Sequence, residues 1–328
     1  MNYKSFADLS IDINNNLFKL NNQGYDLIVG IPRSGMIPAY MIGLYLNVHV
    51  TSLDSFIKNE KLTSGVSRNT KMSLIYAMDA HKVLLVDDSI VTGKAMQLAL
   101  ESIPDNIKKN ITTCAIYSDK KNKPDIDIYL EHVKRPRVFE WNIFHSRLMK
   151  NACLDIEGVL CIDPTEDEND DGDNYIHFIL NAKPLHMPST KLKALVTSRL
   201  EKYRPQTEQW LKAHNIQYDE LIMLDLPSKK ERQKLGAHAK HKAAYYSQSG
   251  LDLFIESAPA QALAIMTATD KPVFCTGDNQ MYMPSLSKTF MKPPKSLLKQ
   301  WEHAIAVKLP SPLKKAIRPI YRTLIFKH

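Results

Sequence analysis

The chain has 328 residues, of which 44% are hydrophobic and 24% are charged, and a formal net charge of +8 at pH 7. These fractions exclude a disordered or fibrous chain, and the length exceeds what one hydrophobic core usually serves, so we expect two domains and a tail. No charged-then-apolar leader opens the chain, and no stretch approaches the ~18 uninterrupted apolar residues of a spanning helix, so we expect a cytoplasmic protein.

The first part of the chain alternates strand and helix patterns. An apolar run covers residues 25–30, a strand pattern with its own apolar run covers 82–86, an amphipathic stretch covers 38–46, and a further helical pattern begins at Lys94. Such an alternation predicts an α/β domain with a parallel sheet.

Two adjacent acids and a polar turn follow the second apolar run, in the segment VLLVDDSIVTG at residues 83–93. Asp87 and Asp88 are suited to accept hydrogen bonds from the vicinal hydroxyls of a ribose. The turn residues can wrap a 5-phosphate with hydroxyls and backbone N–H groups at a helix N-terminus; they are Ser89, Ile90, Val91, Thr92 and Gly93. The segment therefore predicts a site for a phosphorylated sugar, against the plainer reading of an acidic loop after a strand.

A second polar turn lies upstream, in GIPRSGMIPA at residues 30–39. Arg33 offers a cation, and Ser34 and Gly35 allow close backbone approach to an anion. Such a turn alone is more often a surface turn. Residues 56–76, which carry Lys58, Lys61, Arg68 and Lys71, are either a solvated basic loop or a cover over the sugar site.

Together these motifs resemble the type I phosphoribosyltransferases, in which two acids precede a Thr-Gly phosphate loop. The resemblance implies phosphoribosyl pyrophosphate (PRPP) as substrate, with pyrophosphate bound by Pro32, Arg33, Ser34 and Gly35. It also implies Mg²⁺ as the cofactor that neutralises the leaving group, residues 56–76 as a mobile hood, and inversion of α-PRPP to a β-linked product.

A second series of strand patterns begins at Ala152, with the runs ACLDIEGVLC, KALVTSR, LDLFIES and KPVFCTG separated by helical segments such as 203–214. The mixed aromatic and basic segment 134–151 lies between the two series. We therefore predict domains at 1–149 and 150–283, followed by a tail at 284–328.

The run LDIEGVLC resembles the first motif of the haloacid-dehalogenase (HAD) superfamily, whose fold is a second α/β Rossmann-like unit. The resemblance implies that Asp155 attacks phosphorus, that Glu157 protonates the leaving oxygen, and that Mg²⁺ offsets their charge. Phosphatases of this superfamily carry Asp where this chain has Glu157, so the second acid acts normally, acts weakly or does not act.

Later residues follow in that superfamily's order. Thr197, Ser198 and Arg199 are the predicted phosphate contacts, Lys242 is the predicted charge-stabilising residue with Lys240 as its rival, and Glu256 is a predicted metal ligand with Asp155 and Glu157. The acidic stretch 163–173 lacks the ligand spacing of an EF-hand, so we interpret it as a solvated insertion.

Residues 292–328 carry nine Lys and Arg and one Glu, so their net charge is +8, which equals the net charge of the whole chain. Apolar residues Leu313, Ile317, Ile320 and Leu324 fall on one helical face there. A basic amphipathic tail predicts peripheral contact with the cytoplasmic face of the inner membrane, or docking onto the protein's own domains, and it argues against nucleic acid as a partner.

The chain up to about Met283 resembles bacterial proteins that pair a phosphoribosyltransferase with a phosphatase to build ribofuranose into surface polysaccharides such as O-antigen. The resemblance implies a lipid-linked glycan acceptor, other glycan-assembly enzymes as partners, and a bifunctional enzyme that adds 5-phosphoribose and then removes the 5-phosphate. Two alternatives stay open: a nucleobase-salvage enzyme with an accessory nucleotidase, for which Trp141 and its aromatic neighbours are the candidate base-recognition loop, and a PRPP-sensing regulator.

Overall fold

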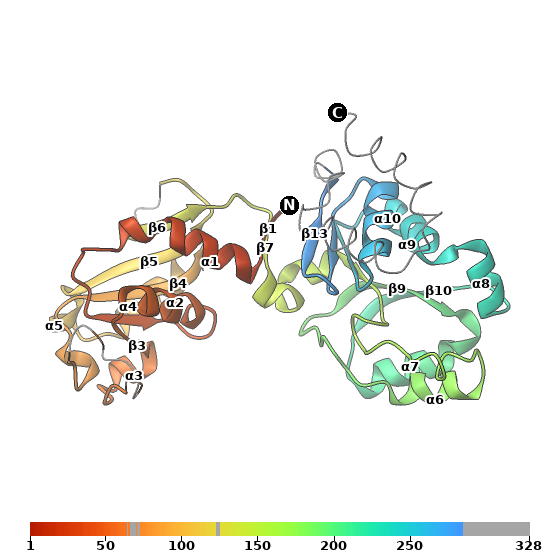
Figure 1. The fold of residues 1–328 in the computed structure, drawn as a ribbon, viewed down its shortest axis with the longest axis horizontal. Coiled ribbons are helices and arrows are strands. Elements are labelled where there is room, and N and C mark those ends of the chain that lie inside the picture. Colours follow the sequence, from red (N-terminus) through yellow and green to blue (C-terminus); the bar gives the residue numbers. More distant parts are fainter. Residues whose placement is uncertain (64, 66–69, 71–72, 123–124, 285–328) are drawn as a thin grey trace, which may run out of the picture.

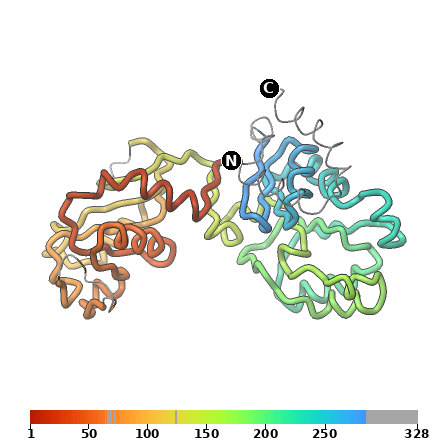
Figure 2. The backbone as a smooth tube through the Cα atoms, in the orientation of Figure 1, coloured from red at the N-terminus to blue at the C-terminus, as the bar shows by residue number. Residues whose placement is uncertain are grey.

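The computed structural model describes residues 1–284 except 64, 66–69, 71–72 and 123–124. Figure 1 shows two α/β units side by side, and Figure 2 traces the chain through the first unit and then the second. The predicted basic tail, apart from its first residue, and the hood residues Arg68 and Lys71 lie outside the described residues. Within the described part of the chain, no helix is both long enough and apolar enough to span a bilayer.

The first unit is a parallel five-stranded sheet in the order β3-β2-β4-β5-β6. Its strands are β2 (Leu27–Gly30), β3 (His49–Ser52), β4 (Val83–Ile90), β5 (Ile111–Ser118) and β6 (Ile128–His132). The predicted α/β class with a parallel sheet is therefore confirmed for this part of the chain.

Helices cover both faces of this sheet, because its central strands are apolar on both sides. Ile28 and Leu84 face a core with α1 (Phe6–Asn15) and α2 (Met36–Leu46). The alternate residues Leu27 and Val83 face a second core. The helices on that side are α3 (Leu53–Ile57), α4 (Lys94–Glu101) and α5 (Asp105–Lys108).

The second unit has a six-stranded sheet in the order β10-β9-β8-β11-β12-β13, in which β13 alone runs antiparallel to its neighbour. Its strands are β8 (Ala152–Leu154), β9 (Leu192–Leu200), β10 (Tyr218–Leu224), β11 (Leu253–Glu256), β12 (Val273–Cys275) and β13 (Gln280–Tyr282). On one face lie α6 (Asp173–Asn181) and α7 (Arg204–Ala213), and on the other lie α9 (Ala237–Gln248) and α10 (Pro259–Thr269), with α8 (Lys229–Leu235) before α9.

The two units are joined through the N-terminus and the segment after β6. Strand β1 (Asn2–Lys4) pairs in parallel with β7 (Arg137–Phe139), and the 3₁₀ turns η3 (Glu140–His145) and η4 (Arg147–Asn151) lead into β8. From β1, the ring of Tyr3 packs on Phe274 at 5.5 Å, and its hydroxyl donates to the Asn279 carbonyl at 2.9 Å. The first residues of the chain therefore contact the second unit directly.

Candidate functional site

The acid pair of the first unit lies near the carboxyl end of β4, at the centre of its sheet. The backbone N–H of Asp88 donates to Asp87 Oδ1 at 2.9 Å, and Trp141 Nε1 donates to Asp88 Oδ2 at 2.7 Å. Asp88 is 5% exposed. The sequence indicates Trp141 only as part of a candidate base-recognition loop, because its hydrogen bond to Asp88 joins residues 53 positions apart and no local pattern encodes such a contact.

The predicted phosphate turn is shorter than expected. Ser89 and Ile90 belong to β4 and pair with Tyr117 and Ser118 of β5, because the strand continues four residues past its apolar run. Val91, Thr92 and Gly93 form the turn before α4, and Gly93 has a φ of 77°. The turn that precedes the helix therefore consists of Val91, Thr92 and Gly93, while the predicted phosphate contacts of Ser89 and Ile90, at the end of β4, stay a prediction.

The upstream turn, residues 32–35, packs beside the acid pair. A Cβ added at Gly35 would lie 2.6 Å from the Ile31 carbonyl and 2.7 Å from that of Val86, so only glycine fits this approach. Pro32 and Arg33 are exposed at the same edge. Since β2 and β4 are parallel neighbours, their carboxyl ends bring the two predicted motifs together.

The carboxyl of Asp87 has a raised pKa of about 7, first because it is buried and second because the Asp88 charge is close. Its ordinary value is 3.8, so the folded protein takes up a proton between about pH 4 and 7, and ionisation of Asp87 lowers stability as the pH rises through that window. Burying the two acids side by side therefore lowers the folding stability at neutral pH, as is common where ionisable groups are placed for binding.

We expect Asp87→Asn to raise the melting temperature at pH 8 and to flatten its dependence on pH between 5 and 8. The asparagine carries no charge to desolvate, whereas wild-type protein gains stability on acidification as Asp87 is protonated. Differential scanning calorimetry at several pH values measures this, with the exposed Glu60→Gln as the control. An unchanged pH slope in Asp87→Asn would show that this carboxyl is not the group that titrates.

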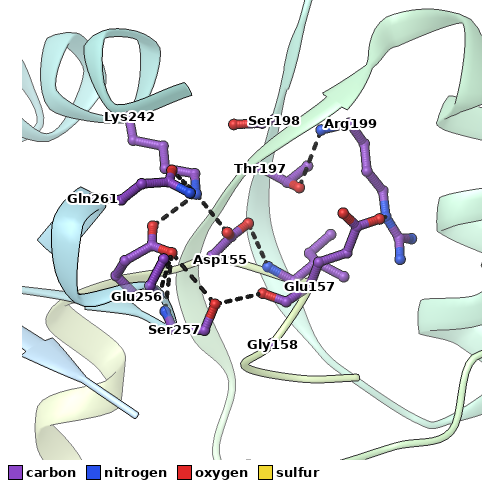
Figure 3. A network of polar contacts seen from close by, with 12 residues as sticks. Asp155, Glu157, Gly158, Thr197, Ser198, Arg199, Lys242, Glu256, Ser257 and Gln261 are labelled. Atoms are coloured by element: carbon purple, nitrogen blue, oxygen red, sulfur yellow. Dashed lines mark hydrogen bonds and ion pairs between the residues drawn. The ribbon is translucent and has the colours of Figure 1, made fainter. Parts of the chain in front are cut away.

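The second unit gathers three charged groups at the carboxyl ends of β8 and β11 (Figure 3). Lys242 Nζ, from α9, lies 2.5 Å from Asp155 Oδ2, 2.7 Å from Glu256 Oε2 and 3.1 Å from Gln261 Oε1. Burial alone lowers the pKa of Lys242, but the two carboxylates outweigh it and raise the pKa. Lys240, the rival in the sequence, is exposed.

The other carboxylate oxygens of this cluster are also hydrogen-bonded. Asp155 Oδ1 accepts from the Ile156 N–H at 2.7 Å, and Glu256 Oε1 accepts from the Ser257 and Ala258 N–H groups at 2.9 and 3.2 Å. Burial and the nearby Asp155 charge raise the pKa of Glu256. Gln261 was not predicted as a site residue. Its position in the first turn of the helix that follows the strand-end carboxylate Glu256 could have indicated it.

Glu157 does not face this cluster. Its Oε1 accepts from Arg199 Nε at 3.0 Å and from the Tyr175 hydroxyl at 2.7 Å, and Figure 3 shows its side chain pointing toward Arg199. Arg199 is fully buried and its Nη1 also donates to Thr207 at 3.4 Å. The placement therefore supports neither Glu157 as the proton donor nor Arg199 as a phosphate contact: the two form a buried ion pair.

The neighbouring hydroxyls of β9 are placed differently. Thr197 Oγ1 accepts from the Arg199 N–H at 3.3 Å, whereas the buried Ser198 hydroxyl has no hydrogen-bond partner among the described residues. Figure 3 shows the Ser198 hydroxyl on the side of the strand that carries Lys242. An unpaired buried hydroxyl is costly, so this one is available to a ligand oxygen.

The predicted metal ligands Asp155, Glu157 and Glu256 do not converge on one point. The ammonium of Lys242 lies between the first and third, and the second is held by Arg199. No group of three His, Cys, Asp or Glu side chains in the described ranges is placed to hold a metal ion. The donor set as placed does not fit Mg²⁺, and no step at this site is derived through it.

Comparison with known proteins identifies the class of domain to which the first unit belongs. Residues 2–149 match the family described as phosphoribosyl transferase domain. The N-terminal unit of this chain is therefore a type I phosphoribosyltransferase domain, and residues 150–328 lie outside that match.

Similar proteins include purine phosphoribosyltransferases. The chain is 26% identical over 136 residues to a xanthine-guanine phosphoribosyltransferase of Cereibacter sphaeroides, covering 38% of this chain and 77% of the relative. Among solved structures, a purine phosphoribosyltransferase of Pyrococcus horikoshii is 21% identical, with 43% of this chain and 92% of that chain covered and a TM-score of 0.30. A xanthine-guanine-hypoxanthine phosphoribosyltransferase of Helicobacter pylori is 12% identical, with 43% and 93% covered and a TM-score of 0.32.

Proposed function

We propose that this chain transfers 5-phosphoribose from PRPP to a glycan hydroxyl and then removes the 5-phosphate to leave β-ribofuranose. In the first step the acceptor hydroxyl oxygen attacks C1, the bond from C1 to the pyrophosphate oxygen breaks, and the hydroxyl proton passes to the departing pyrophosphate or to water, while Asp87 and Asp88 accept hydrogen bonds from the ribose hydroxyls. Mg²⁺ is proposed to enter as the counter-ion of the pyrophosphate.

The Lys242, Asp155 and Glu256 cluster in the same chain as a phosphoribosyltransferase domain is the observation that carries the second step. Asp155 is proposed to attack phosphorus, so that the bond from phosphorus to the ribose C5 oxygen breaks and this oxygen takes a proton from water. Water then hydrolyses the aspartyl phosphate to inorganic phosphate and free Asp155. Lys242 offsets the negative charge, and the Ser198 hydroxyl is free to donate to a phosphate oxygen. The acceptor as a lipid-linked glycan, contact of residues 284–328 with the inner membrane, and partner glycan-assembly enzymes belong to the same proposal.

Incubation of the protein with PRPP, Mg²⁺ and a panel of synthetic glycans, read by mass spectrometry, tests this function. We expect pyrophosphate release together with a ribosylated glycan. Asp87→Asn combined with Asp88→Asn is expected to lower transfer at least tenfold, since both hydroxyl acceptors lose their charge. Binding of PRPP without pyrophosphate release in the presence of any acceptor would favour a regulator instead.

A nucleobase acceptor is the second candidate, favoured by the 26% identity to a xanthine-guanine phosphoribosyltransferase. In that case the second unit would act as a nucleotidase on the product. The same assay with guanine, xanthine and hypoxanthine separates the two functions, because a nucleotide or nucleoside product appears only if a base is the acceptor.

A further inference from the structure

A cavity of about 340 Å³ lies where the two units meet. Its wall combines Phe6 of α1, Trp141 and Phe144 of η3, and Phe274, Thr276 and Asn279 of the second unit. The volume falls at the small end of ligand pockets, ~300–1,000 Å³, and junctions between domains are frequent places for them. Neither of the sites described above includes these residues as a set.

One wall of the cavity is connected to the acid pair of the first unit. Trp141 stacks on Phe139 at 4.9 Å with an interplanar angle of 14°, and its Nε1 donates to Asp88 Oδ2. The indole therefore has one edge at the cavity and its N–H at the carboxylate. A ligand against Trp141 lies next to the residues that hold the ribose in the proposed reaction.

The opposite wall is connected to the Asp155 cluster. Thr276 follows β12 and its N–H donates to the Glu256 carbonyl at 2.8 Å, while its hydroxyl donates to the Gly158 carbonyl at 3.2 Å. Gly158 lies three residues after Asp155, in the loop that leaves β8. The cavity is therefore flanked by both candidate sites, each reached through one hydrogen-bonded residue.

The lining alternates aromatic rings with groups that bond hydroxyls. Besides the rings of Phe6 and Trp141, it presents the carboxylate of Glu140, the amides of Asn142 and Asn279, and the imidazole of His145. Glu140 Oε2 accepts from the Phe6 N–H at 2.8 Å, so its position is fixed by the protein. Aromatic rings pack on the C–H faces of a sugar, and carboxylates and amides bond its hydroxyls.

We propose that this cavity binds a sugar ring of the acceptor glycan and presents the acceptor to both sites in turn. The proposal rests on the proposed function, because it names where that function's acceptor binds. An acceptor whose ribosylated product must first gain and then lose a phosphate needs a binding place that both sites can reach, and the cavity lies between residues bonded to each site.

Saturation-transfer NMR with methyl hexopyranosides of the gluco, galacto and manno series tests the binding directly. We expect transfer from aromatic protons to the sugar ring protons of at least one of them. The double variant Phe6→Ala and Asn142→Ala is expected to weaken hexoside binding about tenfold and to raise the KM for a glycan acceptor by the same factor. The reason is that the variant loses one ring contact and one hydrogen bond from a side-chain amide. Phe18→Ala is the matched control, because Phe18 is a 74% exposed ring of the same unit that does not line the cavity.

The outcomes separate this inference from the function on which it rests. If hexosides bind the wild-type protein and not the double variant, and no ribose is transferred to any glycan, the cavity is a sugar site and the proposed function is wrong. Transfer whose acceptor KM is the same in the double variant and the wild type overturns the cavity. Absence of any hexoside signal also overturns the proposed sugar site. Displacement of a bound hexoside by guanine overturns it as well, because the cavity would then bind a base. Calorimetric titration with PRPP reports whether the first site is intact in the variant.

Discussion

Asp155→Asn is expected to stop removal of the 5-phosphate, so that a phosphoribosylated glycan accumulates while pyrophosphate release continues. The amide keeps the size of the carboxylate and can still accept a hydrogen bond from Lys242, but it cannot form the aspartyl phosphate. Removal of a nucleophile lowers turnover by a factor of about 10³ or more. Mass spectrometry of the glycan product, with a time course of pyrophosphate release, measures both steps in one reaction.

The control for this variant is Asp270→Asn, an exposed position at the end of α10 whose left-handed φ of 51° asparagine also tolerates. It is expected to yield dephosphorylated product at the wild-type rate. If Asp155→Asn also released free ribosylated glycan at that rate, the second unit would not be the phosphatase. Loss of pyrophosphate release in Asp155→Asn would instead show that the first site depends on the second.

The residues that sequence reasoning placed best are those at strand ends. Apolar runs mark buried parallel strands, and polar residues that follow them meet at one edge of the sheet, as Asp155 and Glu256 do. The choice of Lys242 over Lys240 needed the fold, because residues two apart on a helix face nearly opposite sides and only one of these faces the sheet. Spacing along the chain alone left both open.

Contacts across long separations in sequence were beyond prediction. Glu157 has the right position after its strand, yet it is turned toward Arg199, 42 residues later, by an ion pair that the motif does not encode. Strand β10 was missed because its YDELIML sequence mixes charged with apolar residues at the edge of the sheet. The cavity could not be predicted either, because residues that line it, such as Phe6 and Phe274, lie far apart in the sequence.

Lys242→Met is expected to destabilise the protein by about 3–5 kcal/mol at pH 8, the usual cost of removing one partner from a buried ion pair. Asp155 and Glu256 are 5% and 0% exposed, so the variant would leave two carboxylates facing each other without the cation that now lies between them. Urea unfolding followed by circular dichroism measures the loss as a lower midpoint. Lys240→Met, on the exposed side of the same helix, is expected to change stability by no more than about 0.5 kcal/mol.

The pH dependence and a double variant give this prediction its sharpest form. Burial and the nearby Asp155 charge already raise the pKa of Glu256, and loss of the ammonium raises it further, so the loss of stability is largest at pH 8 and shrinks as the pH falls and Glu256 is protonated. Adding Glu256→Gln to Lys242→Met removes one of the two charges and is expected to recover part of the stability, which a double-mutant cycle expresses as a coupling energy. Equal midpoints for Lys242→Met and Lys240→Met would mean that the cluster does not stabilise the fold. If Lys242→Met were equally destabilised at every pH, and Glu256→Gln recovered none of the stability, the loss would come from the packing of the aliphatic part of the lysine side chain.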